Sequence, residues 1–309
     1  MSEEEIVQTF RLSLITESLT EQYTETYMIG AKRYDAPWLA NYIVSFWEPD
    51  EFGHAEPFKN ILMDFGLSKK CIENEIREAR ESTRYHEYHS AGFHPINLTT
   101  YGVIQESITD YWYQLQQGFF SRGSSAAKAI AKVKGREALH TVQFRALTAL
   151  QLEADPSLIT EIIKSVSKFQ MPGNHIPPVK YIAAKTREWI PRMNGSVGQL
   201  LKRIVREVHW ALDDKHKLGF LVTNYASQSE RRFISLLPNS LFHYGLSAIH
   251  GGHGLVGEMV IEQLGLGVTE QNASTNVVTK IHTKFRNIIK RWIQEKLDFE
   301  GLYHESAIH

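Results

Sequence analysis

The chain has 309 residues, of which 42% are hydrophobic and 22% are charged. This composition excludes a disordered, collagen-like or disulfide-rich protein, and it supplies enough apolar side chains for a sizeable buried core. The formal net charge of −1 gives no general attraction to nucleic acid or to acidic membranes. We therefore expect no nucleic-acid partner.

Cysteine usage and the N-terminal residues favour a cytoplasmic location. Cys71 is the single cysteine and cannot close an intrachain disulfide. No run reaches the roughly 18 consecutive apolar residues of a membrane-spanning helix, and Met1–Glu5 is acidic where a signal or transit peptide is basic. We expect a cytoplasmic protein with no membrane span.

Apolar residues recur every three or four positions along most of the chain, which predicts an all-α fold with almost no sheet. Asp155 and Pro156 mark a helix start, because Asp caps free amides and Pro fits the first turn. Residues 170–178 contain prolines and a glycine and are predicted to form a fixed loop. The predicted helices cover residues 7–30, 38–66, 70–90, 99–121, 124–153, 156–169, 196–225, 230–263 and 275–298.

Four of these helices carry acidic or imidazole side chains within an apolar stripe. In chain order the stripes contain Leu14, Glu17, Glu21, Glu25 and Met28; Trp47, Glu51, His54, Phe58, Ile61 and Phe65; Val103, Glu106, Thr109 and Tyr113; and Ile130, Val133, Glu137, His140, Phe144 and Leu147. Residues three or four apart lie on the same face of a helix. Each of the four helices is therefore predicted to turn at least one carboxylate towards the core. In the second helix, Pro49 must start or kink the segment that bears the acid.

Buried carboxylates need a partner, because their uncompensated burial costs on the order of several kcal/mol. Two Glu-x-x-His pairs, Glu51 with His54 and Glu137 with His140, place a carboxylate and an imidazole where both can reach one ion. One Glu from each of two helices and one Glu-x-x-His from each of two others form the ligand set of dinuclear iron or manganese bundles. The alternative is that these are ordinary half-buried polar residues.

The same segments resemble the soluble acyl-[acyl-carrier-protein] desaturase family of the ferritin-like di-iron superfamily. The similarity extends over about residues 18–178, and the matching segments occur in the family's order. They are Thr20–Tyr27, Trp47–His54, Tyr101–Thr109, Glu137–His140, Glu153–Pro156 and Gln170–Pro172. The resemblance implies a ferritin-like four-helix bundle in residues 1–190, with a helical C-terminal extension in residues 191–309 packed on it.

The resemblance also implies that the protein is a homodimeric enzyme with two iron ions. Such an enzyme would use O2 and electrons from a ferredoxin-type donor to desaturate an acyl chain carried on acyl carrier protein. Thr109 could donate a hydrogen bond or a proton near the metals, or simply bond back to a helix carbonyl. Trp47 could carry electrons or simply fill the core. The implied metal ligands are Glu21, Glu51, His54, Glu106, Glu137 and His140.

Departures from the family pattern leave alternatives open. The interval from Glu21 to Glu51 is shorter than the family's. Glu17 or Glu25 could therefore be the ligand in place of Glu21. The family's arginines between the paired ligands are absent, and Arg136 stands where the family carries an acid. These changes keep a related oxygenase of natural-product biosynthesis, acting by hydroxylation or N-oxidation, as an alternative. A further alternative is a metal-binding bundle without enzymatic activity.

A docking site for the carrier is predicted from charge. Acyl carrier proteins are acidic, so a near-neutral enzyme needs a local basic patch to bind one. The predicted docking residues are Lys128, Lys132, Lys134 and Arg136. A second basic segment lies on the predicted helix 275–298, whose apolar stripe favours a solvated face instead.

The remaining histidine groups are not expected to bind metal, because none lies in an apolar stripe with partner carboxylates. They are His86, His89 and His94; Asp213 with His216; and His250 with His253.

Overall fold

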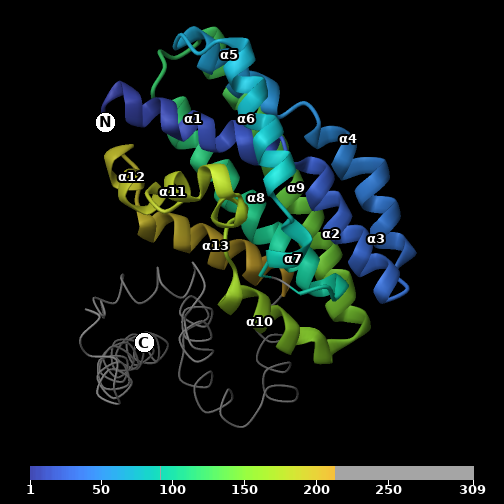
Figure 1. Cartoon of the computed structure of the whole chain (residues 1–309). Helices are drawn as coiled ribbons and strands as arrows, with labels where there is room; N and C mark the ends of the chain where they lie inside the picture. The colour runs from blue at the N-terminus through green and yellow to red at the C-terminus, as the bar shows by residue number, and fades with distance from the viewer. Residues whose placement is uncertain (91, 213–309) are drawn as a thin grey trace, which may run out of the picture.

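The computed structural model describes residues 1–90 and 92–212 (Figure 1). The predicted helices at 230–263 and 275–298, and the histidines beyond residue 212, lie outside the described residues. Within the described part the chain forms helices and turns without a strand, so the predicted all-α class is confirmed. No described helix has the length and apolar character needed to cross a membrane.

The described helices follow the predicted order with several differences in their bounds. They are α1 Glu3–Glu17, α2 Thr20–Arg33, α3 Pro37–Tyr42, α4 Glu48–Glu51, α5 Ala55–Asp64, α6 Lys69–Ser82, α7 Tyr85–Tyr88, α8 Pro95–Gln117, α9 Ser125–Ala154, α10 Ile159–Lys168, α11 Lys180–Ala183, α12 Thr186–Arg192 and α13 Val197–Ala211. A π-helical turn, η1 (Ile43–Trp47), joins α3 to α4. Short 3-10 turns cover Pro156–Leu158, Pro172–His175 and Pro177–Val179.

Side-chain caps set several helix starts. The Ser124 hydroxyl accepts a hydrogen bond from the Ala127 amide and caps α9. Asp155 accepts a hydrogen bond from the Ser157 amide, so the predicted start at Asp155 is confirmed. The predicted loop at residues 170–178 consists of two proline-initiated 3-10 turns.

Two predicted helices are divided. The predicted helix 7–30 ends at Glu17 and restarts at Thr20, and the Ser18 hydroxyl donates 2.7 Å to the Leu14 carbonyl at the break. Such bonds from a side chain to the backbone compete with the helical pattern. The predicted helix 38–66 is divided by η1 and restarts with Pro49 in the first turn of α4, as expected for a proline there.

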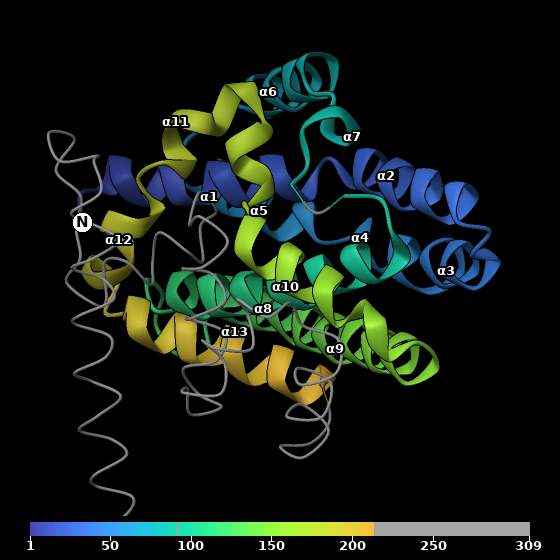
Figure 2. The same cartoon turned by 90° about the horizontal axis from the view of Figure 1, so that it is seen from below.

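Helices α8 and α9 form the centre of the fold. In Figure 2, α8, α9 and α13 run side by side, and α1 and α2 follow one another across the molecule above them. Gly102 of α8 allows close packing, because a Cβ atom there would lie 2.6 Å from the Phe144 ring of α9. The described part of the C-terminal extension, α13, packs against both central helices.

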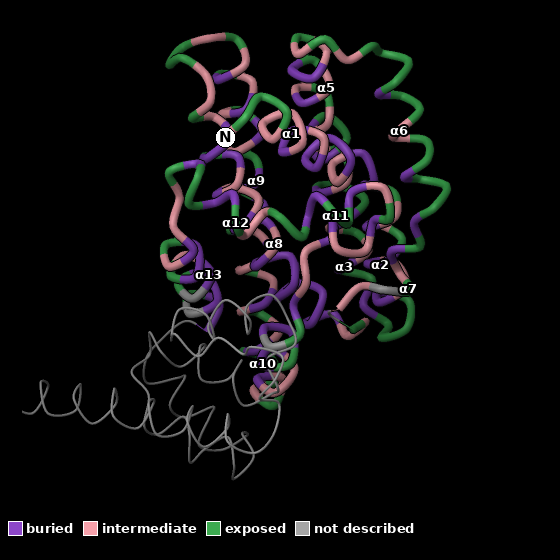
Figure 3. The backbone as a smooth tube through the Cα atoms, turned by 60° about the vertical axis from the view of Figure 1, so that its left-hand side comes forward, coloured by how far each residue is buried: buried purple, intermediate pink, exposed green. Residues whose placement is uncertain are grey.

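Two apolar clusters form the core. The larger one includes Trp47 and Phe144, and the smaller one includes Phe58 and Tyr113. Helix α6 covers the outside of the bundle and is exposed along most of its length (Figure 3). Any polar group between the two clusters is removed from water on both sides.

Candidate metal centre

Six of the inward-facing polar residues converge at one place in the bundle. They form two groups, each of which brings its ligand atoms within 4.8 Å of one another. The His54 site comprises Glu17, Glu51, His54 and Glu137; the His140 site comprises Glu51, Glu106, Glu137 and His140. Glu51 and Glu137 belong to both sites, so the cluster has the layout of two adjoining ion sites with shared carboxylates.

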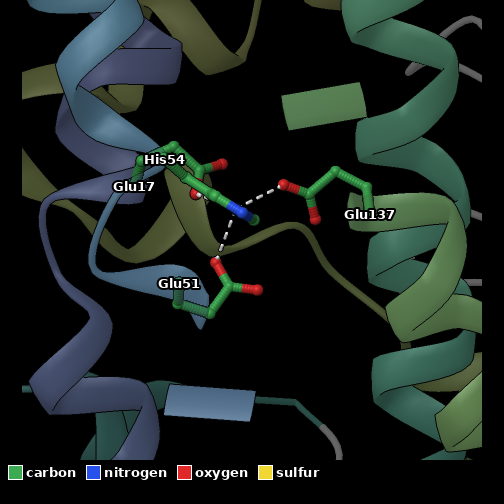
Figure 4. Close-up of side chains that lie close together, drawn as sticks. All are labelled: Glu17, Glu51, His54 and Glu137. Carbon is green, nitrogen blue, oxygen red and sulfur yellow. Dashed lines mark ion pairs between the residues drawn. The ribbon is translucent and has the colours of Figure 1, made fainter. Parts of the chain in front are cut away.

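The two imidazoles lie at the centre of the cluster. Figure 4 shows His54 between carboxylates of two helices, with its Nδ1 atom 2.8 Å from Glu137 Oε1 and 3.1 Å from Glu51 Oε2. The Glu17 carboxylate is 3.8 Å from the same nitrogen. The His140 Nδ1 atom lies 2.8 Å from Glu51 Oε1 and 3.9 Å from Glu137 Oε2. Each imidazole therefore reaches both shared carboxylates.

Local sequence explains how the ligands are positioned. Glu137 and His140 lie one turn apart on the regular helix α9, so they face the same side. Glu51 ends the short helix α4, and His54 precedes α5. The π-helical turn η1 and Pro49 interrupt the regular helix just before this pair and turn it towards α9.

The cluster is buried and lacks the hydrogen-bond partners that such burial requires. Glu51, His54, Glu106, Glu137 and His140 are each at most 5% exposed. Burying an unpaired carboxylate or imidazole is strongly unfavourable. In spite of the short distances given above, several buried cluster atoms make no hydrogen bond of suitable geometry: Glu51 Oε1, His54 Nδ1 and Nε2, Glu106 Oε1, Glu137 Oε1 and His140 Nδ1. Carboxylate oxygens and imidazole nitrogens are ligands of iron and manganese, so these residues fit a metal ion.

The pKa values of the buried acids also favour a bound metal ion. Burial, together with the charges of Glu137 and Glu51, raises the pKa of Glu17 and of Glu106 well above its ordinary value. Four acids cannot all ionise at this place without added positive charge. The cluster thus favours a bound cation.

The pKa values of the two imidazoles are raised as well, which favours their charged form. Burial alone would lower these values, but the close carboxylates of Glu137 and Glu51 raise the pKa of His54 to about 12 and that of His140 to about 10. The same two imidazoles hold the pKa of Glu137 below its ordinary range in spite of its burial. A protonated imidazole supplies the positive charge that a metal ion would supply.

The structure corrects one predicted ligand. Glu21 is half exposed, and its carboxylate lies 3.3 Å from Arg80 on the outside of the bundle. Glu17 takes the expected place in the cluster, because the helix break after Glu17 changes the face on which the following residues lie. Glu25, the other alternative, is also exposed and pairs with His86.

Thr109 and Trp47 lie close to the cluster, and the buried indole nitrogen of Trp47 has no hydrogen-bond partner. The Thr109 hydroxyl donates 2.9 Å to the Gln105 carbonyl, which is the helix back-bond. Trp47 is 1% exposed and packs on Tyr27, with its ring centroid 6.5 Å from that of His140. Trp47 therefore contacts the ring of His140, and the hydroxyl of Thr109 is used by its own helix.

Two hydrogen-bond contacts to the ligands were missed by sequence reasoning. Asp50 Oδ2 lies 2.8 Å from His140 Nε2 and accepts a hydrogen bond of 2.6 Å from Arg136 Nε. The Tyr113 hydroxyl donates to Glu17. Asp50 and Arg136 each precede a ligand in sequence, and this adjacency was the available signal.

An apolar cavity of about 100 Å3 lies beside the cluster. Three of its lining residues adjoin ligands: Thr16 precedes Glu17, Tyr113 bonds to Glu17, and Thr109 lies one turn after Glu106. The cavity is smaller than a ~150 Å3 cavity that binds benzene. In this conformation it takes a small apolar group or a short segment of a chain.

The predicted docking residues are only partly available. Lys128 and Lys132 are exposed on α9. Lys134 lies 4.0 Å from Asp110, and Arg136 is bonded to Asp50. Two of the four predicted residues therefore face solvent without either of these contacts.

Among residues 1–90 and 92–212, the two sites above are the groups of acidic, histidine and cysteine side chains arranged to hold an ion. His86, His89 and His94 are not in such a group. No family model, curated protein or solved structure matches the chain. The similarity to desaturases accordingly rests on the segments quoted above.

Proposed function

We propose that the chain is a dinuclear iron enzyme that uses O2 to oxidise an acyl chain, with desaturation as the reaction. The observation that supports this most strongly is the set of four carboxylates and two imidazoles from four parts of the bundle, all within ligand reach. The family resemblance adds the reaction type. Iron, when bound, would supply the redox chemistry with O2.

Charge supports two divalent ions. Four ionised carboxylates carry four negative charges and balance two ferrous ions, while the imidazoles add neutral ligands. Glu51 and Glu137, which belong to both sites, are the residues suited to bridge the ions. A single ion would leave part of the buried negative charge uncompensated.

The cavity is the proposed place of the reacting segment. Ile108 and Trp112 from α8 and Leu12 from α1 contribute apolar lining. Such walls bind methylene groups and exclude water from them. The Tyr113 hydroxyl holds the Glu17 carboxylate at the boundary between cavity and cluster.

The proposed reaction removes one hydrogen from each of two neighbouring carbons. O2 accepts these two hydrogens, together with two electrons and two protons, and leaves as two water molecules. The electrons come from a ferredoxin-type donor. The carrier that presents the chain would dock at the exposed lysines Lys128 and Lys132.

Hydroxylation is the second candidate, and one observation favours it. The residues around the second ligand pair depart from the family, with Arg136 bonded to Asp50. A changed environment of the ligands is expected to change the outcome of the same oxygen chemistry. A bundle that stores or merely binds metal would show no product.

The test combines metal analysis with mass spectrometry. Glu137→Ala is expected to lose at least one iron and all oxidation, and Glu17→Ala to lose iron as well, whereas the neighbouring control Glu21→Ala keeps both. Acyl-carrier substrates incubated with O2 and reduced ferredoxin should lose two hydrogens. A gain of one oxygen atom would establish hydroxylation, and full iron content in the Glu137→Ala protein would exclude the assigned centre.

A further inference from the structure

The two imidazoles of the cluster differ in what holds their outer nitrogen. His140 Nε2 lies 2.8 Å from Asp50 Oδ2, and Asp50 is itself held by Arg136 at 2.6 Å. A histidine that donates its Nε2 proton to a carboxylate presents the lone pair of Nδ1 to a metal. His140 Nδ1 is the atom that faces the cluster.

The ion pair between Asp50 and Arg136 also connects two ligand-bearing segments. Asp50 precedes Glu51 in α4, and Arg136 precedes Glu137 in α9. The bond between them fixes the short, interrupted helix α4 against the long helix α9. Glu51 and Glu137 belong to both sites, so the ligand that this contact supports in one site alone is His140, which Asp50 contacts directly.

His54 has no such support. Its Nε2 atom is buried and has no hydrogen-bond partner. Its Nδ1 atom faces Glu137, Glu51 and Glu17. Binding a metal through Nδ1 leaves the Nε2 proton buried and unpaired, and no carboxylate fixes the ring orientation.

Each site also has one carboxylate that the other site lacks, and the surroundings of these two carboxylates favour the His140 site as well. Glu106 of the His140 site is 2% exposed on the continuous helix α8. Glu17 of the His54 site is the last residue of α1 and lines an open groove of about 360 Å3. One Glu17 oxygen already accepts the Tyr113 hydroxyl. The Glu17 side chain is 9% exposed, so water can compete with a metal there more than at Glu106.

From this asymmetry we propose that the cluster fills in a fixed order, in which the His140 site binds the first metal ion tightly and the His54 site binds the second more weakly. Asp50 is the positioning residue for the tight site. The proposal rests on the proposed dinuclear function. Loss of such a carboxylate partner of a ligating histidine lowers metal affinity by about 10- to 100-fold, so the two steps should differ by about this factor.

The experiment is a titration of the full-length, metal-free protein with Co2+ by calorimetry and visible absorption, repeated anaerobically with Fe2+. Wild type should bind two ions in two resolved steps. Asp50→Ala should weaken the first step by about 10- to 100-fold and shift its Co2+ bands, so that the two steps merge. In Asp50→Asn the amide oxygen can still accept the His140 proton, so the affinity of the first step should lie between those of wild type and Asp50→Ala. This variant provides the test if the alanine variant does not fold.

Two further variants separate the sites. Glu17→Gln should remove the weak step and leave the tight one. Asp110→Ala is the matched control, because Asp110 is also a half-buried aspartate bonded to an arginine, Arg203, but it holds no ligand imidazole. Both steps should persist in that variant.

The outcomes distinguish this proposal from the proposed function. Two ions bound in wild type with equal affinity, or a first step lost in Glu17→Gln and unchanged in Asp50→Ala, would overturn the order of filling and leave the dinuclear centre standing. A wild-type protein that binds neither Co2+ nor Fe2+ would overturn the dinuclear centre and the filling order together.

Discussion

Replacing Glu106 by glutamine should stabilise the metal-free protein and weaken the metal-loaded one. Glu106 is buried, one of its oxygens has no hydrogen-bond partner, and it lies beside Glu137 and Glu51. Without metal this carboxyl must take up a proton or remain charged next to other acids. Glutamine has nearly the same shape, carries no charge and can donate a hydrogen bond to a neighbouring carboxylate.

The size of the effect follows from linkage. Burial, followed by the charges of Glu137 and Glu51, raises the pKa of Glu106 well above 4.5 in the folded state. Between 4.5 and the folded pKa, the folded protein binds a proton that the unfolded chain does not. The free energy of unfolding therefore falls by about 1.4 kcal/mol for each pH unit of increase in that window. Glutamine needs no proton in the folded state, so it would remove this dependence on pH.

Thermal unfolding in a chelator and in excess Fe2+ or Co2+ measures both effects. At about 2–4 °C per kcal/mol, the melting temperature of the metal-free Glu106→Gln protein should gain on that of wild type by about 3–6 °C for each pH unit of the window. The gain should shrink towards pH 4.5. With metal the order should reverse, because bound metal stabilises the intact cluster. A Glu106→Gln protein that is less stable than wild type in chelator would refute the account of Glu106 as an uncompensated buried acid.

Other expectations follow from the structure. Burial lowers the pKa of His89 to about 4, so between pH 6.5 and pH 4 the unfolded chain binds a proton at this position that the folded protein does not. The free energy of unfolding should therefore fall by up to about 3 kcal/mol as the pH is lowered through that range. His89→Gln should flatten this part of the pH profile measured by denaturant titration, and an unchanged profile would contradict the prediction. Gly102→Ala should lower the free energy of unfolding by about 1–3 kcal/mol because of the clash with Phe144, measured by urea titration, and equal or greater stability would show that the helices can separate at no cost. Reversing Lys128 and Lys132 to glutamate should raise KM for an acyl-carrier substrate and weaken its salt dependence at constant iron content; an unchanged KM would reject docking at α9.

Much of the candidate centre could be predicted from spacing. Glu-x-x-His on one helical face requires only the period of the helix, and this period brings Glu137 and His140 together. Glu106 was recognisable as an acid in an apolar stripe. The structure brings Glu51, His54, Glu106, Glu137 and His140 together as expected.

The first ligand was not predictable in the same way. Glu17, Glu21 and Glu25 are four residues apart, so a continuous helix would place all three on one side. The break at Ser18 and Leu19 depends on local hydrogen bonds, such as that of the Ser18 hydroxyl, which apolar periodicity does not encode. The short interval to Glu51 was the signal that left Glu17 and Glu25 open as alternatives to Glu21.

Contacts between segments that are far apart in the sequence could not be predicted either. Arg136 stood out as a basic residue beside a ligand, and the pattern alone suggested lost support for the ligands. In the structure its guanidinium bonds to Asp50, which holds His140. Residues so far apart in sequence are paired by the tertiary fold, and neither helix shows the pairing by itself.

The most direct test is a crystal structure of the iron-loaded protein with anomalous data collected at the iron edge. We predict two anomalous peaks in the cluster, with Glu51 and Glu137 contacting both ions, His54 and Glu17 on one side and His140 and Glu106 on the other. A fully folded, iron-saturated protein with no peak among these six residues, or with iron bound elsewhere, would contradict the assignment of the centre.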